Sequence, residues 1–523
     1  MIAFRVGDRP DLIDAVFRRS ALYREKWERD DYRDSTVGKA IAFTKERLAD
    51  AETDSEKVMP PFVVVSARGN ESISAPLLLQ YTKEHLRFLM VKAETGEEIR
   101  VYVYRDGVYQ LFDRLMFEGE MRKFISAYDD SLSKVSVLEE AWNLLMMEHD
   151  RCIDPQELNS CQDLINFENG LLRLTGGKPV LLPHTPDVFS TIRIPCRWEE
   201  KGISTPVFDA FLNTLCSGDE DIQRLLIEFI GVALSCIPGY KTKKSLFLVG
   251  PGNTGKSLFR SLLEAILGKK NCISIDLREM ENRFGTGYLD GKRLAGSADM
   301  SFLNVQEMSV FKNLTGGDSV FAEAKFEKGF SFRYSGLLCF CMNRLPKFGG
   351  DNGPWVYERI MPVECLNVIP PQQRDPYLLE KLCDEKEGIV QKAVGALCSV
   401  IERGCRFSEP DSVRSCLSRY REENSSVSSF YYECMCRKST ECRADEDLTV
   451  MTVYSAYREY CKTNNNGFCK QKKDFHAELA GLLGYGDPEA MFIRRSIGKV
   501  YVDYTLTPEA RALYCRSYFL PSM

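Results

Sequence analysis

The residues of this chain that are best suited to chemistry lie in one run of eight. The run consists of Gly250, Pro251, Gly252, Asn253, Thr254, Gly255, Lys256 and Ser257. Its glycines allow the backbone to curl so that N–H groups point inward at phosphate oxygens. Lys256 can then reach the β- and γ-phosphates, and the Ser257 hydroxyl can bind Mg²⁺. The run therefore predicts a phosphate-binding loop, with ATP and Mg²⁺ as the expected cofactors.

The segments on either side decide between a phosphate site and an ordinary glycine-rich turn. Ser245–Val249 is a short apolar run that predicts a buried strand. After the loop, apolar residues recur at helical spacing, at Leu258, Leu262, Leu263 and Ile266. A strand, a loop and a helix in this order are what a phosphate-binding loop requires, and the helix adds the positive end of its dipole. We therefore favour nucleotide binding over a turn without a ligand.

ATP hydrolysis needs three further groups, and the chain offers a candidate for each. An acid must hold Mg²⁺ and orient water, a polar side chain must sense the γ-phosphate, and an arginine usually stabilises the transition state. Asp299 follows the apolar stretch Arg293–Ala298, Asn343 follows Gly336–Met342, and Arg359 begins another apolar strand. The carboxyl ends of parallel strands border the nucleotide crevice, which favours these roles. The ordinary alternatives are a turn aspartate, a turn residue before proline and a strand-edge charge.

The bulk properties of the chain are those of a protein with several globular domains. Its 523 residues suffice for roughly three domains. The longest apolar run, Leu226–Pro238, is too short to cross a bilayer, so we expect no membrane partner. The net charge of −6 gives no overall basic signature, although a DNA channel lined by a few lysines needs none. The nineteen scattered cysteines and the lack of a signal-like start favour free thiols in a host cell's cytoplasm.

Local signals predict the elements that must position these groups. Asp106-Gly107 lies between alternating apolar runs and predicts a hairpin in Arg100–Phe112. Val207–Leu234 predicts two helices, and Ser319–Phe326 with Phe330–Tyr334 predicts a second hairpin. A helix-and-hairpin pattern near the end of the chain suggests a winged helix. Its parts are Val450–Thr463, Lys473–Leu483, Met491–Arg495 and Lys499–Leu506.

The order of these features resembles that of superfamily 3 helicases, specifically the poxvirus-type and phage- and plasmid-type primase–helicases. The similar segments within about Val101–Leu506 are Leu164–Thr175, Pro183–Pro186, Gly250–Ser257 (Walker A), Arg293–Asp299 (Walker B), Lys312–Asp318 with Ala324–Phe326, Cys341–Pro346 (sensor 1), Trp355–Pro362 (arginine finger) and Val453–Tyr457 with Phe475. The ordered set is more specific than Walker A alone. Asp299 follows Lys256 by 43 positions, and Asn343 follows Asp299 by 44 positions.

The resemblance implies a multidomain α+β and α/β protein with an AAA+-like P-loop ATPase core. Such a chain would form a homohexameric ring and translocate on single-stranded and forked DNA in the 3′ to 5′ direction, as the replicative helicase of a phage, plasmid or other mobile element. Origin DNA and replication proteins would be further partners. Asp299 would serve Mg²⁺ and water, Asn343 would sense the γ-phosphate, and Arg359 would act on the ATP of the next subunit.

The combined pattern predicts five parts. They are residues 1–75 of unassigned role, 76–240 as an N-terminal helical and mixed oligomerisation domain, 241–371 as the ATPase motor, 372–445 as a helical connector, and 446–523 as a winged-helix-like DNA-binding domain. Two departures from the family pattern stand out. Ala298 precedes a lone Asp299 where an acidic pair is common, and no primase domain is evident. An initiator that uses ATP only to assemble and a helicase–primase therefore stay open as alternatives.

Contacts to DNA are expected from basic and aromatic side chains near the hairpin tip, Lys325, Phe326 and Lys328. A solvated hairpin tip is the alternative. In the C-terminal part, further basic groups suit phosphate contacts. They are Lys470, Lys472, Lys473, Arg494 and Arg495. Cys434, Cys436 and Cys442 are one ligand short of a closed zinc site, which only His476 could complete, so we favour buried or free thiols there.

Overall fold

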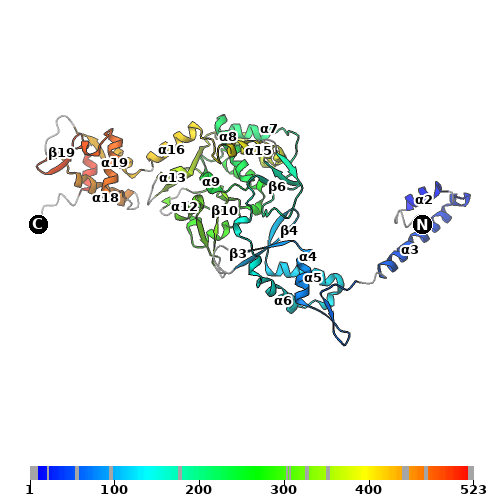
Figure 1. Cartoon of the computed structure of the whole chain (residues 1–523). Coiled ribbons are helices and arrows are strands. Elements are labelled where there is room, and N and C mark those ends of the chain that lie inside the picture. Colours follow the sequence, from blue (N-terminus) through cyan, green and yellow to red (C-terminus); the bar gives the residue numbers. More distant parts are fainter. Residues whose placement is uncertain are drawn as a thin grey trace. The chain divides into compact units, whose positions relative to one another are not determined.

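The computed structural model describes twelve stretches of the chain. They are residues 10–20, 23–53, 58–92, 98–174, 179–301, 304–305, 308–323, 329–348, 354–423, 425–438, 447–464 and 469–515. The chain divides into two compact units. Figure 1 shows the chain in colours that follow the sequence. One unit combines Met1–His85 with Arg114–Met147, and the other combines Leu86–Asp113 with Glu148–Met523.

The first unit is mainly helical. Its elements are α2 (Pro10–Arg18), η1 (Glu25–Glu28), α3 (Asp30–Thr53), β1 (Val63–Val65), β2 (Glu71–Ile73), α4 (Ala75–His85), α5 (Arg114–Asp129), η2 (Asp130–Leu132) and α6 (Val135–Met146). The side chain of Trp27 is buried among Ile13 and Val37, and its indole N–H donates to Asp14 at 2.7 Å. Helices α4, α5 and α6 pack on one another through apolar faces.

A five-stranded parallel sheet forms the centre of the second unit. In spatial order its strands are β10 (Cys272–Ser274), β11 (Leu294–Gly296), β15 (Leu337–Met342), β9 (Ser245–Val249) and β17 (Ile360–Glu364). The strand that carries the phosphate loop, β9, therefore has neighbours on both sides. β15 separates it from β11, the strand that leads to Asp299. A parallel sheet of this kind needs a cover on both faces.

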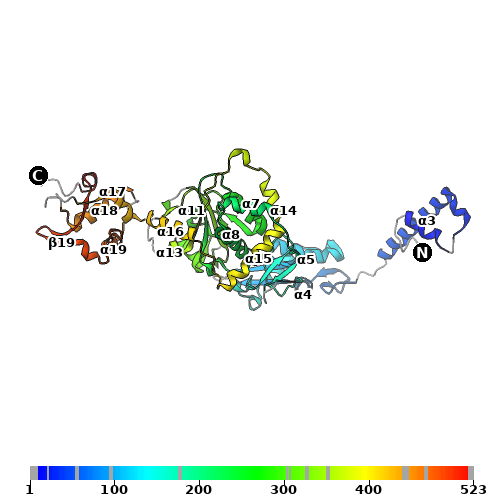
Figure 2. The same cartoon turned by 90° about the horizontal axis from the view of Figure 1, so that it is seen from above.

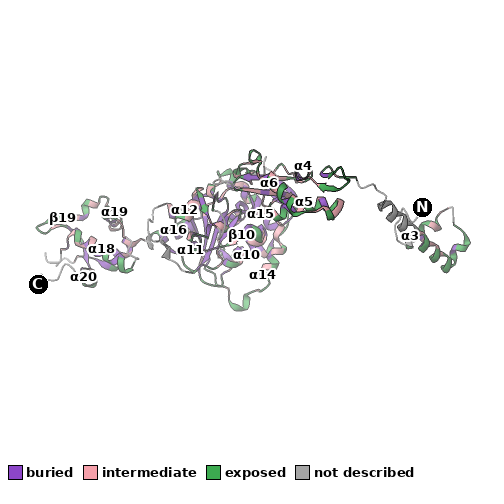
Figure 3. Cartoon of the chain, turned by 90° about the horizontal axis from the view of Figure 1, so that it is seen from below, coloured by how far each residue is buried: buried purple, intermediate pink, exposed green. Residues whose placement is uncertain are grey.

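Two hydrophobic cores provide that cover, because side chains alternate along each strand. Leu246 and Leu248 of β9 enter one core, whereas Phe247 enters the other. The first core contains helices α7 (Pro206–Leu215), α8 (Glu220–Leu234), α10 (Lys256–Leu267), α14 (Leu378–Asp384) and α15 (Lys386–Glu402). Figure 2 shows α7, α8, α14 and α15 gathered apart from α11 and α13, and Figure 3 shows buried residues concentrated around β10 and α10.

The second core is formed mainly by elements that lie between β10 and β17 in the chain. They are α11 (Leu277–Glu281), η7 (Thr286–Leu289), α12 (Ser309–Gly316), β13 (Ser319–Ala322), β14 (Phe330–Arg333) and α13 (Pro354–Arg359). The same stretch of chain also contains β12 (Asn304–Val305) and β16 (Lys347–Phe348). β13 and β14 form the expected antiparallel hairpin. Val305 belongs to β12, which pairs with β16, and α12 begins at Ser309.

Two small antiparallel sheets precede the central one. They are β3 (Phe88–Lys92), β4 (Ile99–Arg105) and β5 (Val108–Phe112), and β6 (Leu164–Phe167), β7 (Gly170–Arg173) and β8 (Val180–Leu182). The predicted hairpin in Arg100–Phe112 is confirmed. Its turn residues Asp106 and Gly107 have φ values of 50° and 79°, which is why an Asp-Gly pair is favoured there. Gly176-Gly177 lies outside the described residues. Short helices complete this region: η3 (His149–Arg151), η4 (Pro155–Glu157), α9 (Gly239–Thr242) and η6 (Lys269–Asn271).

The rest of the chain is helical with short strands. Its elements are η8 (Pro371–Gln373), α16 (Asp411–Glu423), α17 (Ser426–Cys434), β18 (Met435–Arg437), α18 (Val450–Asn464), α19 (Lys472–Leu483), η10 (Pro488–Met491), β19 (Phe492–Arg495), β20 (Gly498–Tyr501), β21 (Tyr504–Leu506) and α20 (Pro508–Tyr514). The predicted final strand Lys499–Leu506 is two strands. β20 pairs with β19, whereas β21 pairs with β18, and this second pairing joins distant segments that local patterns cannot connect. No described helix is long and apolar enough to span a membrane.

Candidate functional site

The loop between β9 and α10 has the backbone shape that its glycines predict. Gly250 and Gly255 adopt φ values of 149° and 98°, which side-chain-bearing residues rarely adopt. A Cβ at Gly250 would lie 2.1 Å from the carbonyl oxygen of Cys365, and one at Gly255 would lie 3.1 Å from the Phe211 ring. The loop is therefore held in place by contacts with α7 and with the segment after β17.

The side chain of Lys256 is folded back into this loop. Its Nζ donates to the carbonyl oxygens of Gly250 at 2.7 Å and Pro251 at 2.6 Å, and to the hydroxyl of Thr254 at 3.2 Å. Burial lowers the pKa of the Lys256 ammonium, and the nearby carboxylate of Asp299 opposes that shift. The amine thus lies among oxygen acceptors that a bound phosphate could replace one for one.

The structure brings Ser257 and Asp299 to the same edge of the sheet. The Ser257 hydroxyl donates to the carbonyl oxygen of Ala298 at 2.8 Å, and the next residue, Asp299, has an exposed side chain. The backbone there is held in place because Met300 N–H donates to Cys341 at 2.8 Å. A hydroxyl and a free carboxylate at one edge are ligands of the kind that Mg²⁺ uses beside a phosphate.

Asn343 lies at this edge as well. The first glycine of the loop, Gly250, donates its N–H to the carbonyl oxygen of Met342 at 3.2 Å, and Asn343 is the next residue. Met342 also pairs with Met300 in an isolated parallel bridge. The side chain of Asn343 is exposed. The ends of β9, β11 and β15 therefore bring Lys256, Asp299 and Asn343 to the same edge of the sheet.

Arg359 lies elsewhere, at the end of α13. Its guanidinium donates to the carbonyl oxygen of Lys312 and, at 2.9 Å, to the hydroxyl of Thr315, both at the end of α12. It also stacks over the Trp355 ring at 5.2 Å from the centroid. Burial lowers the pKa of the Arg359 guanidinium, and the carboxylate of Asp318 opposes the shift. In this chain, Arg359 binds the negative end of the α12 dipole rather than the phosphate loop.

The residues expected to contact DNA are only partly described. Lys325, Phe326 and Lys328 lie outside the described residues, between the described ends of β13 and β14. In the C-terminal part, Lys470 binds Glu478, and Arg495 lies 3.6 Å from Asp447, so both cations are partly neutralised. Lys472 donates to the sulfur of Met451 at 2.9 Å, whereas Lys473 and Arg494 are exposed.

The expected thiols form no metal cluster among the residues that the structure describes. Cys434 is buried and Cys436 is half-buried, whereas Cys442 lies outside those residues. Burial raises the pKa of the Cys434 thiol to about 12 and lowers the pKa of His476 to about 4. Both groups are therefore neutral near pH 7, as expected for packed side chains.

Sequence reasoning missed the segment that follows β17. Cys365 donates its N–H to Val249 at 2.7 Å, and Ile369 donates to the carbonyl oxygen of Asn253 at 2.9 Å. These bonds fix the phosphate loop from more than a hundred residues away. These bonds use backbone groups, so no residue type in the segment predicts them. Only the pairing of β17 with β9 could have revealed them.

Two protein families match separate parts of the chain. The family described as "Family of unknown function (DUF5906)" matches residues 248–359, which include the phosphate loop, Asp299, Asn343 and Arg359. The family described as "NrS-1 polymerase HBD domain" matches residues 1–49.

The chain is also distantly similar to viral proteins that are named as helicases. It is 22% identical over 383 residues to "Putative helicase L207/L206" of Acanthamoeba polyphaga mimivirus, which covers 67% of this chain and 38% of that protein. It is 24% identical over 272 residues to "Putative helicase 022R" of Frog virus 3, which covers 47% of this chain and 27% of that protein. The chain thus spans well under half the length of these relatives.

Among solved structures, the apo A form of the NrS-1 C terminal region is similar in part. The superposition has a TM-score of 0.45 and 9% sequence identity, and it covers 82% of this chain and 98% of that chain.

Proposed function

We propose that this chain is an ATP-dependent DNA helicase motor of a mobile element, of the superfamily 3 type with an AAA+-like core. It would assemble as a homohexameric ring, translocate 3′ to 5′ on single-stranded DNA and unwind forked duplexes. The observation that carries the proposal is the meeting of Lys256, Ser257, Asp299 and Asn343 at the carboxyl edge of one parallel sheet. Ligands of α/β sheets bind at this edge. The distant similarity to viral proteins named as helicases supports the same class.

The residues present fit ATP and Mg²⁺. Bound Mg²⁺ would neutralise charge on the β- and γ-phosphates, with Ser257 and Asp299 as its protein ligands. Lys256 would exchange the carbonyl oxygens of Gly250 and Pro251 for phosphate oxygens, since all are oxygen acceptors within its reach. Asn343 would orient the γ-phosphate or the attacking water from the end of β15.

The direct test measures ATP hydrolysis and strand separation with the full chain. We expect ATPase activity that single-stranded DNA stimulates, and ATP-dependent unwinding of a duplex with a 3′ single-stranded tail. Hydrolysis without unwinding would favour an initiator that uses ATP only to assemble. The absence of both ATP binding and hydrolysis would contradict the proposal.

Arg359 tests whether the active unit is a ring. We propose that its guanidinium leaves α12 when subunits assemble and reaches the ATP of the neighbour. Arg359→Ala should then lower ATPase activity about 1000-fold, the scale of arginine fingers, and spare nucleotide binding. Mixing Arg359→Ala with Lys256→Ala chains should restore some activity at interfaces that combine two intact halves. If mixing restores none, Arg359 acts within its own chain, as the contacts to Lys312 and Thr315 would suggest.

A helicase–primase is the second candidate, because residues 1–49 match a domain family named after a polymerase. Primer synthesis on a single-stranded template, measured with the full chain and all four nucleotides, separates the two. Extension products would favour the second candidate, and unwinding without synthesis would favour the first.

A further inference from the structure

A cleft lies beside the β13–β14 hairpin. Its cavity volume is about 340 Å³. It is lined by Val91, Lys92, Arg100 and Tyr102 of β3 and β4, by residues of β14, and by Tyr240. The lining residues that the structure describes all belong to the second unit.

The charge of this cleft is opposite to that of the whole chain. The chain carries a net charge of −6, whereas the described lining of the cleft holds Lys92, Arg100 and Arg333 against one carboxylate, Asp290. Arg100 forms ion pairs with Asp290 and, at 3.5 Å, with Glu98. No described residue forms an ion pair with Lys92 or Arg333, and both are exposed. Among the described residues, these two cations therefore have no carboxylate partner, and they could bind an anion that enters the cleft.

Aromatic side chains line the same cleft. Tyr102, Tyr240 and Phe330 line the cleft and are all partly exposed. The Arg100 guanidinium stacks over the Phe330 ring at 4.2 Å from its centroid. This stack joins β4 to the hairpin, and the Arg100–Asp290 ion pair joins β4 to the turn after η7. Partly exposed rings beside unpaired cations are the combination that binds bases and phosphates of a single strand.

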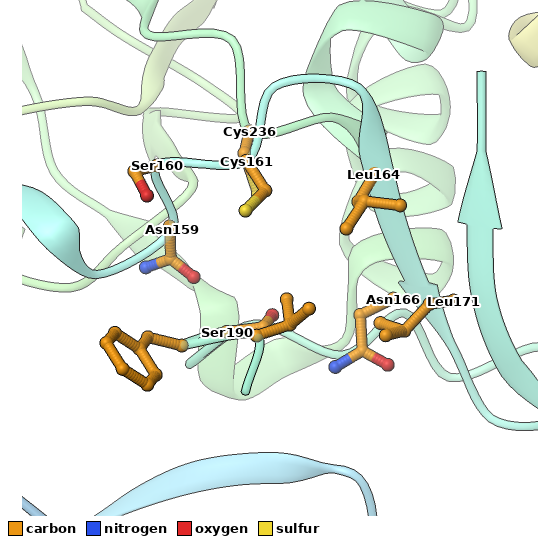
Figure 4. A pocket seen from close by; sticks show the side chains of 10 residues that line it. Asn159, Ser160, Cys161, Leu164, Asn166, Leu171, Ser190 and Cys236 are labelled. Atoms are coloured by element: carbon orange, nitrogen blue, oxygen red, sulfur yellow. The ribbon is translucent and has the colours of Figure 1, made fainter. Parts of the chain in front are cut away.

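The lining of the cleft also includes polar groups that could contact base edges. Asn159, Ser160 and Cys236 line the cleft and also a small adjoining pocket of about 10 Å³. Figure 4 shows this pocket, with Cys161 and Cys236 near one end and Asn166 and Ser190 at the other. The Asn159 amide donates to the Thr191 hydroxyl at 2.7 Å, which fixes its orientation.

We propose that this cleft binds single-stranded DNA, with Lys92 and Arg333 on phosphates and Tyr102, Tyr240 and Phe330 stacking on bases. The choice of DNA rests on the proposed function, but the binding itself needs no ATP. An acidic protein segment would use the cations and leave the rings and amides without partners, so the nucleic acid is the better fit. Movement of the DNA through this cleft would couple the DNA to β14. Through β14 it would couple the DNA to the site at Asp299 and Asn343.

The test compares two double variants of the full chain by anisotropy with a fluorescent oligothymidine. Lys92→Ala with Arg333→Ala removes the two unpaired cations. Lys269→Ala with Arg278→Ala removes the same charge from exposed sites outside the cleft. We expect about tenfold or more weaker binding for the first pair, since charged hydrogen bonds are lost. The slope of log affinity against log salt should fall by about 1.4, at roughly 0.7 per phosphate contact. Equal losses in both pairs would overturn the cleft as the site.

Stacking is tested separately by Tyr102→Phe and Tyr102→Ala, together with ultraviolet crosslinking and peptide mapping. The phenylalanine variant should bind like the natural chain, and the alanine variant about five- to tenfold more weakly, with an unchanged unfolding temperature as the folding control. Crosslinks should map to peptides with Tyr102, Tyr240 or Phe330. Crosslinks confined to residues 425–515, or competition by an acidic peptide but not by oligothymidine, would overturn the proposal. ATPase measurements with Lys256→Ala address the proposed function independently, because the binding assay contains no nucleotide.

Discussion

Polar residues lie at both edges of the central sheet, but they have different roles at the two edges. At the amino edge, Arg293 is only 1% exposed, and its guanidinium donates to the carbonyl oxygens of Ala233 at 3.0 Å, Ser335 at 2.6 Å and Ile237 at 2.8 Å. At the carboxyl edge, Asp299 and Asn343 are exposed. A buried guanidinium whose three nitrogens are all hydrogen-bonded marks a structural role, whereas exposed polar side chains beside a glycine-rich loop mark a place for a ligand.

The cause of this difference is the direction of the strands. Strands β9, β11 and β15 run parallel, so each enters from the same side and each ends on the other. Helix α8 ends beside the amino edge, and Arg293 binds its last carbonyl groups. The carboxyl edge instead meets the start of α10, where unused N–H groups favour an anion. Four changes would break or sharpen this comparison.

The largest expected effect is that of Lys256→Ala. ATPase activity should fall about 1000-fold, because the charge that stabilises the transferred phosphoryl group is lost. The unfolding temperature should change little, since Nζ binds only oxygens of its own loop. Lys269→Ala, an exposed lysine just after α10, is the matched control. Undiminished hydrolysis by Lys256→Ala would contradict the site.

Arg293→Ala should instead destabilise the fold, by about 3–4 kcal/mol in the free energy of unfolding. The buried carbonyl groups that it satisfies would be left without donors. Chemical denaturation measures the change, and the exposed Arg278→Ala should stay within about 0.5 kcal/mol of the natural chain. If Arg293→Ala loses ATPase activity at unchanged stability, Arg293 takes part in the reaction. The two edges of the sheet would then not differ in role.

Asp299→Asn should lower ATPase activity about 100-fold at limiting Mg²⁺, because one anionic ligand is lost while the shape is kept. Raising the Mg²⁺ concentration should recover part of the activity. The exposed Asp221→Asn in the first turn of α8 serves as the control. If added Mg²⁺ does not recover any of the lost ATPase activity, Asp299 acts only in activating water.

The smallest effect is expected for Tyr334→Phe, close to Arg293. The hydroxyl of this buried tyrosine donates to the carbonyl oxygen of Leu337 at 3.1 Å, so its removal should cost about 1 kcal/mol of stability. Hydrolysis at saturating ATP should be unchanged when measured well below the unfolding temperature. A large fall in the rate would show that the amino edge influences the chemistry at the other edge.

Several parts of this structure could be predicted because they depend on neighbours in the chain. The hairpin at Asp106-Gly107 and the strand, loop and helix around Lys256 follow from local turn chemistry and periodicity. The same holds for the break between α7 and α8, where Asp219 caps α8 by accepting from Asp221 and Ile222. The split of the last predicted strand into β20 and β21 was missed, because each pairs with a different distant partner.

By itself, the sequence determined that this protein has a glycine-rich loop between a strand and a helix, and which acid, amide and arginine could serve a nucleotide there, since those features are short-range patterns of residue type. Only the tertiary structure decided their geometry. It placed β15 between β9 and β11, bringing Asp299 and Asn343 to the loop, and it bound Arg359 to α12. It also joined β4 to the hairpin through Arg100 and Phe330 and so formed the cleft. Strand order and side-chain contact depend on packing between distant segments, which no local pattern encodes.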